Sequence, residues 1–207
     1  MPLDAATLRA LLIAAAEQVI ACAPELTALD QAIGDGDHGA NMKRGFEAVL
    51  SKIDAISAQP IGDAVKTVGK TLVMTVGGAS GPLYGSFFMA MGDAINSGRQ
   101  LPEDLADAFA AGVDAVSKRG RSQAGEKTML DVLIPVLDRL RADAGRADLT
   151  RVVCAVATDA MERTAPMLAT KGRASYLGAR SIGHIDPGAR SSCVLVHAIC
   201  TTLEDHL

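Results

Sequence analysis

The sequence is poor in aromatic residues, with no tryptophan, two tyrosines and four phenylalanines among its 207 residues. Domains rich in β-structure rely on aromatic and β-branched side chains, so this scarcity disfavours a β-rich fold. Positive charge is not in excess either, because 20 lysines and arginines stand against 24 aspartates and glutamates. A general nucleic-acid-binding protein needs a basic surface, and we therefore expect no nucleic-acid partner.

Long uncharged apolar runs and a secretory leader are also missing. We find no stretch of about 18 uncharged apolar residues and therefore predict no membrane-spanning segment and no membrane partner. Residues 1–10 include the acidic Asp4 and lack a basic segment followed by an apolar run, so we expect no signal peptide and a cytoplasmic protein. Four cysteines form no CxxC pair and are expected to be reduced core thiols: Cys22, Cys154, Cys193 and Cys200.

Apolar residues make up 49% of the chain, and their spacing is helical. The periodicity predicts eight helices, at about residues 5–23, 39–54, 61–75, 81–97, 102–118, 128–143, 149–169 and 187–204. Pro102 is expected in the first turn of the fifth helix. The run 192–196 could form a strand, but the length of its segment favours a helix that Asp186 caps. With no long linker and no repeat, we predict one all-α domain over residues 1–207.

The order of the helices predicts where the connections lie. If the eight helices run up and down, the connections 23–38, 75–80, 119–127 and 170–186 share one end of the bundle. The remaining connections, near 55–60, 97–101 and 144–148, share the other end and are short. The first set holds almost every glycine-rich and acid-rich motif, which indicates one composite site at one end.

The most informative motif is DQAIGDGDHG at residues 30–39. Asp30, Asp35 and Asp37 carry like charges that repel one another unless a cation neutralises them. Oxygen ligands suit Mg²⁺, Mn²⁺ or Ca²⁺, and the spacing is not that of an EF-hand. The alternative is a solvated acidic turn in which Asp37 caps the next helix. Three carboxylates beside three glycines and His38 favour metal binding.

Three further motifs lie in the connections of the same set. The turn GGASG at residues 77–81 can present backbone N–H groups to an anion at a helix N-terminus, although close helix packing explains its glycines equally well. The segment 169–188 is long, and it contains Lys171, Arg173 and Arg180, which can contact phosphate or simply be solvated. GEKTM at residues 125–129 precedes the sixth helix, where Thr128 is expected to cap it or lie in its first turn. A metal site with a phosphate cradle and no covalent nucleophile is typical of phosphoryl transfer.

Four motifs in this order resemble the nucleotide-binding L subunit of dihydroxyacetone kinase. They are LTALDQAIGDGDHGANM, GGASGPLYG, GEKTML and KGRASYLGARSIGHIDPGA, and the resemblance covers nearly the whole chain. It implies an eight-helix up-and-down antiparallel barrel with ADP or ATP bound at one end through two Mg²⁺ ions. By match to the family's motifs, the expected Mg²⁺ ligands are Asp30, Asp35 and Asp37.

The same match implies a set of nucleotide contacts, drawn from all four connections. They are His38, Gly39, Ala40, Asn41, Gly78, Ala79, Ser80, Gly81, Gly120, Thr128, Met129, Arg180, Asp186, Pro187 and Gly188. Arg173 is an alternative to Arg180, because it also lies within reach by sequence. Ala179 stands where the family commonly has an acidic residue, which affects a peripheral contact only.

The resemblance also implies a division of labour between subunits. A separate K subunit holds dihydroxyacetone covalently on its own histidine, and the L subunit brings the nucleotide. In one form of the enzyme, a phosphohistidine M subunit of the phosphotransferase system rephosphorylates ADP in place. In the ATP-dependent form the K and L domains are fused, and nucleotide exchanges with solvent. Separate L subunits also occur in systems for related ketoses, so an ATP-dependent kinase for a ketose such as erythrulose is the alternative. Two alternatives from other classes are a nucleotide-sensing module without phosphoryl transfer and a helical carrier of an apolar ligand.

Overall fold

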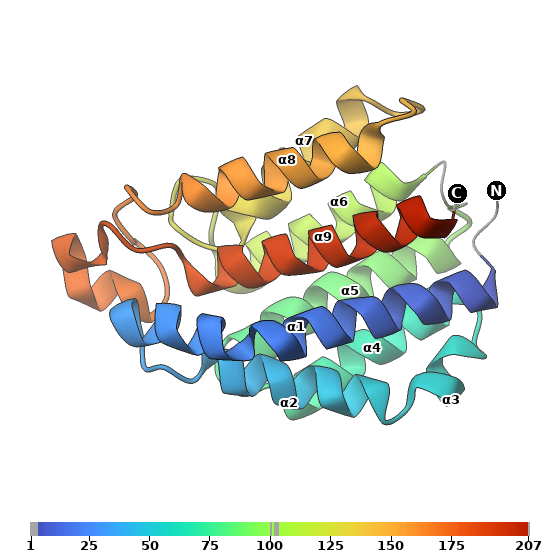
Figure 1. The fold of residues 1–207 in the computed structure, drawn as a ribbon, viewed down its shortest axis with the longest axis horizontal. Helices are drawn as coiled ribbons and strands as arrows, with labels where there is room; N and C mark the ends of the chain where they lie inside the picture. The colour runs from blue at the N-terminus through green and yellow to red at the C-terminus, as the bar shows by residue number, and fades with distance from the viewer. Residues whose placement is uncertain (1–3, 100, 102–103, 207) are drawn as a thin grey trace.

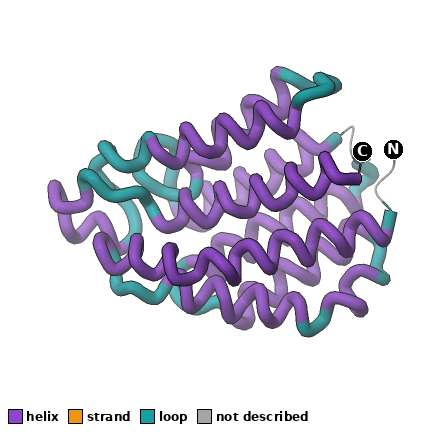
Figure 2. Tube along the Cα trace, viewed as in Figure 1, coloured by secondary structure: helices purple, strands orange, loops and turns teal. Residues whose placement is uncertain are grey.

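The computed structural model describes residues 4–99, 101 and 104–206, and every regular element in them is a helix (Figures 1 and 2). Eight of these helices are long, one α-helix is short, and a 3₁₀ segment, η1, precedes the last helix. Their bounds are α1 Ala5–Ile33, α2 His38–Leu50, α3 Ile53–Ser57, α4 Ile61–Thr75, α5 Ser80–Asn96, α6 Leu105–Gly120, α7 Leu130–Ala142, α8 Leu149–Glu162, η1 Arg173–Ser181 and α9 Pro187–His206.

The long helices form a closed ring. Each one packs against the next, with the short α3 between α2 and α4, and α9 returns to pack against α1. The helices run roughly along one direction in Figure 1 and alternate in sense. The predicted all-α, up-and-down bundle is therefore confirmed.

The apolar faces of the helices meet inside this ring. Leu26, Met42, Leu72 and Leu130 come from four different helices and are completely buried. Burial of a leucine-sized side chain stabilises the folded state by about 1.5–3 kcal/mol. The helical spacing of apolar residues that predicts the helices thus also supplies the core.

Glycines allow α4 and α5 to approach closely. A Cβ atom built on Gly69 would lie 2.8 Å from the carbonyl oxygen of Gly85 and 2.9 Å from the backbone nitrogen of Met89. Both neighbours are backbone atoms, which cannot move without displacing the helix.

We therefore expect Gly69→Ala to destabilise the fold by about 1–3 kcal/mol, the usual cost of overpacking. The control is Lys70→Ala at the next, exposed position, for which a change within about 0.5 kcal/mol is expected. Urea denaturation of both variants measures the difference, and equal stabilities would contradict this account of the α4–α5 contact.

The first helix is longer than predicted. The sequence pattern predicts its end near Ala23, but α1 continues through Pro24 to Ile33. Proline removes one helical hydrogen bond, yet Leu26 and Ile33 beyond it are almost fully buried, and this packing outweighs the lost bond. Asp30 consequently lies on the last turn of a helix and not in a loop.

Other predicted boundaries also change. The second predicted helix, 39–54, divides into α2 and the short α3, and the seventh, 149–169, ends at Glu162. The connection before α9 is not wholly irregular, because η1 occupies Arg173–Ser181. The predicted position of Pro102 lies outside the described residues.

The helix α1 is long and apolar enough to cross a membrane, with a mean hydropathy of 1.5 in its most apolar 18-residue window. The sequence analysis predicts no membrane-spanning segment, but α1 passes the test by length and composition alone. In this fold α1 is a member of the ring, and its buried face packs against α2 and α9. Of the residues in that apolar window, 28% are buried.

Candidate functional site

Figure 1 shows the connections α1–α2, α4–α5, α6–α7 and α8–α9 at one end of the ring, opposite the start of α1 and the end of α9. Side-chain contacts join them: His38 to Ser80, Arg173 to Asp35, and Lys171 to the carbonyl oxygen of Arg121. The helices α2, α5, α7 and α9 all begin here. Helix N-termini carry free N–H groups and a positive dipole end, so this end of the molecule favours anions.

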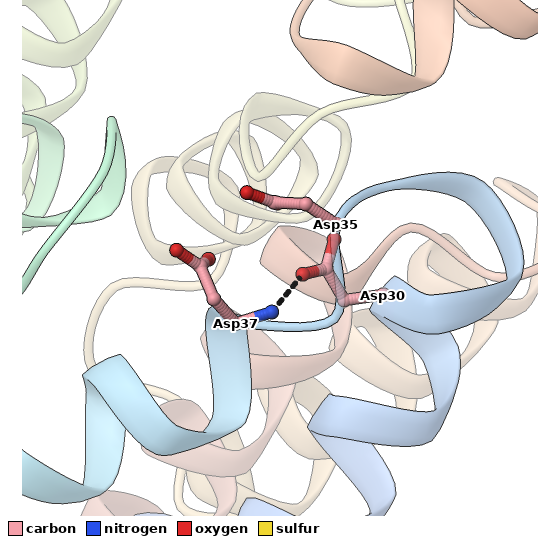
Figure 3. A group of neighbouring side chains, drawn as sticks. All are labelled: Asp30, Asp35 and Asp37. Carbon is pink, nitrogen blue, oxygen red and sulfur yellow. Dashed lines mark hydrogen bonds between the residues drawn. The ribbon is translucent and has the colours of Figure 1, made fainter.

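Three carboxylates gather at the turn between α1 and α2 (Figure 3). One oxygen each from Asp30, Asp35 and Asp37 lies within 4.8 Å of the other two. Asp30 is anchored, because its Oδ2 accepts hydrogen bonds from the backbone nitrogens of Asp37 (2.8 Å) and His38 (3.1 Å). Asp35 and Asp37 are exposed. An oxygen-only cluster of this kind suits a hard divalent cation.

An arginine from η1 closes one side of this cluster. Nη2 of Arg173 lies 3.1 Å from Oδ2 of Asp35, although the two residues are far apart in sequence. Arg180, the residue predicted to contact the nucleotide, is exposed and has no ion pair in the described part of the chain. The geometry thus brings Arg173, the alternative, to the acidic cluster.

The small-residue turn before α5 faces the start of α2. Gly78 has a left-handed φ of +64°, which glycine adopts without strain. A Cβ built on the preceding Gly77 would lie 2.7 Å from Oδ1 of Asn41, so the turn and α2 are in close contact. Gly39 is turned the other way, because its missing side chain allows contact with Ala23 and Thr27 of α1. Among the residues predicted from the first motif, Gly39 thus serves helix packing.

His38 connects three helices through a buried hydrogen-bond network. Its ring nitrogens lie 2.9 Å from Oγ of Ser80 on α5 and 2.9 Å from Oγ of Ser191 on α9. The hydroxyl of Tyr84 also contacts Ser191, at 2.7 Å. Burial lowers the pKa of His38, while the charges of Asp30 and Asp37 raise it. The lowered pKa favours a neutral imidazole that positions the hydroxyl of Ser80.

The turn before α7 is held by a capping box. Oδ2 of Asp131 accepts a hydrogen bond from the backbone nitrogen of Thr128 (2.7 Å), and Oγ1 of Thr128 accepts one from Leu130 (3.2 Å). Oδ1 of Asp131 also accepts from Gly125. Thr128 thus contacts the first turn of α7 from the position just before the N-cap residue, Met129, and Gly120 lies at the end of α6 just before this connection.

The starts of α7 and α9 meet. A Cβ built on Gly188 would lie 3.5 Å from both the Cβ and the backbone nitrogen of Met129. Asp186 caps α9, as predicted, because its Oδ2 accepts from the backbone nitrogen of Ala189 at 2.7 Å. Burial raises the pKa of Asp186 to about 7, opposed by the backbone hydrogen bond from Ala189.

Sequence reasoning missed three residues that organise this end. Asp131 has a signal, because Thr128 and Asp131 have the spacing of a capping box. Tyr84 and Lys127 have none, because a buried tyrosine or lysine looks like a core or surface residue until its partners are known. Lys127 is almost fully buried and donates to backbone carbonyls of the α8–α9 connection.

Comparison with known proteins gives three concordant results. Residues 32–201 match the DAK2 domain. The chain is 49% identical over 177 residues to the PEP-dependent dihydroxyacetone kinase 1, ADP-binding subunit DhaL, of Listeria innocua, covering 86% of each chain. It is 43% identical over 185 residues to the PEP-dependent dihydroxyacetone kinase, ADP-binding subunit DhaL, of Escherichia coli, covering 87% of this chain and 88% of that one.

The fold is also similar to that of a solved structure, the dihydroxyacetone kinase of C. freundii in complex with AMP-PNP and Mg²⁺. The TM-score is 0.78 at 24% identity, and the match covers 97% of this chain and 34% of that longer chain. This likeness concerns the fold. From the domain match and the two close relatives, the chain belongs to the DhaL family, the ADP-binding subunits of dihydroxyacetone kinases and thus of phosphotransferases.

Proposed function

We propose that the whole chain, residues 1–207, acts as one nucleotide-binding domain that presents Mg²⁺-bound ADP or ATP at the end described above. The phosphoryl group passes to dihydroxyacetone held on a separate K subunit. One observation carries the proposal: three carboxylates within 4.8 Å of one another face an end where four helices begin. Cations and helix N-termini are the two kinds of group that stabilise phosphates.

The acidic cluster fits the metal. Mg²⁺ prefers oxygen ligands and binds proteins through few carboxylates plus phosphate oxygens, which leaves room for a nucleotide. Asp35 and Asp37 are exposed and able to bind a cation, and Asp30 keeps one oxygen free of its two backbone donors. Mg²⁺ would neutralise charge on the phosphates, and we propose two such ions.

The phosphates and the base are assigned to opposite walls of the site. His38, Ala40, Asn41 and residues 78–81 are proposed to face the phosphates, since they surround the start of α2 and α5. Gly120, Thr128, Met129 and residues 186–188 are proposed to hold the remainder of the nucleotide. Arg173 is preferred to Arg180 as the cationic contact, because it reaches the acidic cluster.

The surface around this end supports a protein partner. The large apolar side chains that are exposed in the described residues are Val73, Met74, Leu168, Tyr176 and Ile182. All five flank the connections α4–α5 and α8–α9, at the site end. Exposed apolar side chains beside a site whose described residues provide no sugar-capturing nucleophile indicate a surface that another subunit covers. We assign that subunit as K.

The donor proposed is a phosphohistidine M subunit that rephosphorylates bound ADP in place. Both bacterial relatives carry the words "PEP-dependent" in their names, which supports this route. The protein would then work in the cytoplasm, where phosphohistidine carriers operate. An ATP-dependent kinase for a related ketose such as erythrulose is the second candidate.

Hydrogen exchange tests the position of the site. A ligand that binds the folded state alone raises protection where it contacts the chain. On addition of Mg-ADP, protection should rise in residues 30–41, 77–81, 120–129 and 172–188. The connections at 51–60 and 97–99, at the other end of the ring, are the internal control. Protection confined to one connection, or found at the control end, would contradict the composite site.

A further inference from the structure

Lys127 is a lysine in an unusual place. Only 1% of its surface is exposed, and lysine is almost never fully buried unless its charge is met by other groups. Its backbone has a left-handed φ of 62°, which a non-glycine residue adopts only when its surroundings hold it there. Burial lowers the pKa of Lys127, partly offset by the charge of Asp186.

Four backbone carbonyl oxygens surround the ammonium group. Nζ donates to the carbonyl oxygens of Thr164 (2.8 Å), Ala165 (3.2 Å), Met167 (3.2 Å) and His184 (2.5 Å). Within the residues that the structure describes, no carboxylate lies at ion-pair distance from Nζ. A ring of backbone carbonyl oxygens is the way channels coordinate a small monovalent cation. The ammonium group of Lys127 therefore resembles a bound cation that its own side chain links to the backbone.

This carbonyl cage joins two segments that form one wall of the proposed nucleotide site. Lys127 belongs to the turn before α7, next to Thr128 and Met129. Its acceptors lie just after α8 and just before Asp186. A backbone hydrogen bond from Thr170 to the carbonyl of Glu126 also joins the two segments. A second bond, from the backbone nitrogen of Asp186 to Oγ1 of Thr164, holds the two ends of the α8–α9 connection together.

Movement of either segment would displace the other. Met129 and Gly188 are in contact, and each directly follows a segment tied to Lys127. Without the ammonium group, four carbonyl oxygens would lose a charged donor together, and they would repel one another. The start of α9 would then no longer be held at its present distance from α7.

We propose that Lys127 is a positioning residue for the nucleotide, and that its carbonyl cage is a cation site occupied by a tethered cation. The ammonium group sets the spacing between Met129 and residues 186–188. The proposal rests on the nucleotide-binding function proposed above. Its consequence is specific: a free alkylammonium ion of matching length should replace the missing side chain.

Chemical rescue of Lys127→Ala tests this consequence in the full-length chain. Alanine keeps Cβ, so propylammonium supplies the missing three carbons and the nitrogen. We expect Lys127→Ala to lose about 10- to 100-fold in affinity for Mg-ADP by calorimetry, since small misplacements of a site have effects of this size. Propylammonium should restore most of that affinity in a saturable manner, and propanol at equal concentration should not.

Two variants serve as controls. Lys127→Met keeps an apolar stem that fills the space of propylammonium, so its affinity should fall and should not be rescued. Lys66→Ala removes a lysine that pairs with Asp93 away from the cage, and its affinity should equal that of the unaltered protein. Unaltered affinity in Lys127→Ala would overturn the positioning role. A loss that propylammonium leaves unchanged would overturn the cation cage.

Hydrogen exchange measured without nucleotide tests the carbonyl cage independently of the proposed nucleotide-binding function. In Lys127→Ala, amides at 164–170 and 183–189 should exchange faster and be protected again by propylammonium. If the unaltered protein bound no Mg-ADP, the proposed function would fail while this result still stood. If Lys127→Ala does not fold unaided, its refolding yield should rise when propylammonium is added and should not rise with propanol. Equal yields would overturn the proposal.

Discussion

Asp35→Asn and Asp37→Asn should each weaken Mg-ADP binding by about 100-fold or more. Loss of a residue that merely supports a metal ligand commonly lowers metal affinity by about 10- to 100-fold, and loss of a ligand should have at least that effect. Without its cation, the remaining carboxylates would repel the phosphates. Calorimetry of each variant and of the unaltered protein in Mg²⁺ measures the loss of ADP affinity. For the unaltered protein, equal ADP affinity in Mg²⁺ and in EDTA would contradict a metal-bridged site.

The three aspartates should differ in their effect on the fold. Asp35 and Asp37 are exposed, so asparagine at either position relieves repulsion within the cluster. Asp35→Asn also weakens the exposed ion pair with Arg173, so the thermal stability of the free protein should change little in either variant. Asp30 also accepts two backbone hydrogen bonds, and Asp30→Asn should lower both metal binding and stability. Asp54→Asn is the matched control, because its side chain is 88% exposed and pairs with Arg9, away from the cluster.

The pure chain should not phosphorylate dihydroxyacetone, with ATP or with any other phosphoryl donor. The described residues at the site supply carboxylates, hydroxyls and a buried histidine bonded on both nitrogens, and none of these is placed as a free nucleophile for the sugar. Mixing with a K subunit should produce turnover from a baseline at the detection limit. The K subunit alone, and the mixture with Asp37→Asn, are the controls.

The phosphoryl donor follows from the same reconstitution. Turnover that needs phosphoenolpyruvate, the phosphotransferase proteins and an M subunit would support the proposed route, and turnover with ATP alone would favour the second candidate. Comparing dihydroxyacetone with erythrulose in each mixture identifies the ketose. Steady turnover by the chain in preparations free of K subunit would refute the division between subunits.

Local sequence patterns predict much of the fold. Helical spacing of apolar residues predicts the eight long helices, because a helix must bury one face and the code for that face is periodic. Alternation of direction then places four connections at one end, which the structure confirms. The three carboxylates are equally visible in the sequence, since all lie within eight residues and need no distant partner to be recognised.

The helix boundaries and the site's supports were decided by tertiary packing. The apolar spacing predicts that the first helix ends near Ala23, but α1 continues to Ile33 because Leu26 and Ile33 are buried in the core, and no local pattern contains that energy. The family resemblance implies Arg180 as the cationic contact, with Arg173 as the alternative, and the path of η1 brings Arg173 to Asp35.

The sequence by itself determined the helices, their alternating order and the chemistry gathered at one end, because propensity, periodicity and charge act over a few residues. Only the tertiary structure decided which distant groups meet. His38 contacts Ser191, which is 153 positions away in the sequence, and Lys127 donates to the carbonyl of His184, which is 57 positions away. Those partners depend on closure of the ring, where burial removes water and each polar group must be satisfied by whatever segment the fold brings next to it.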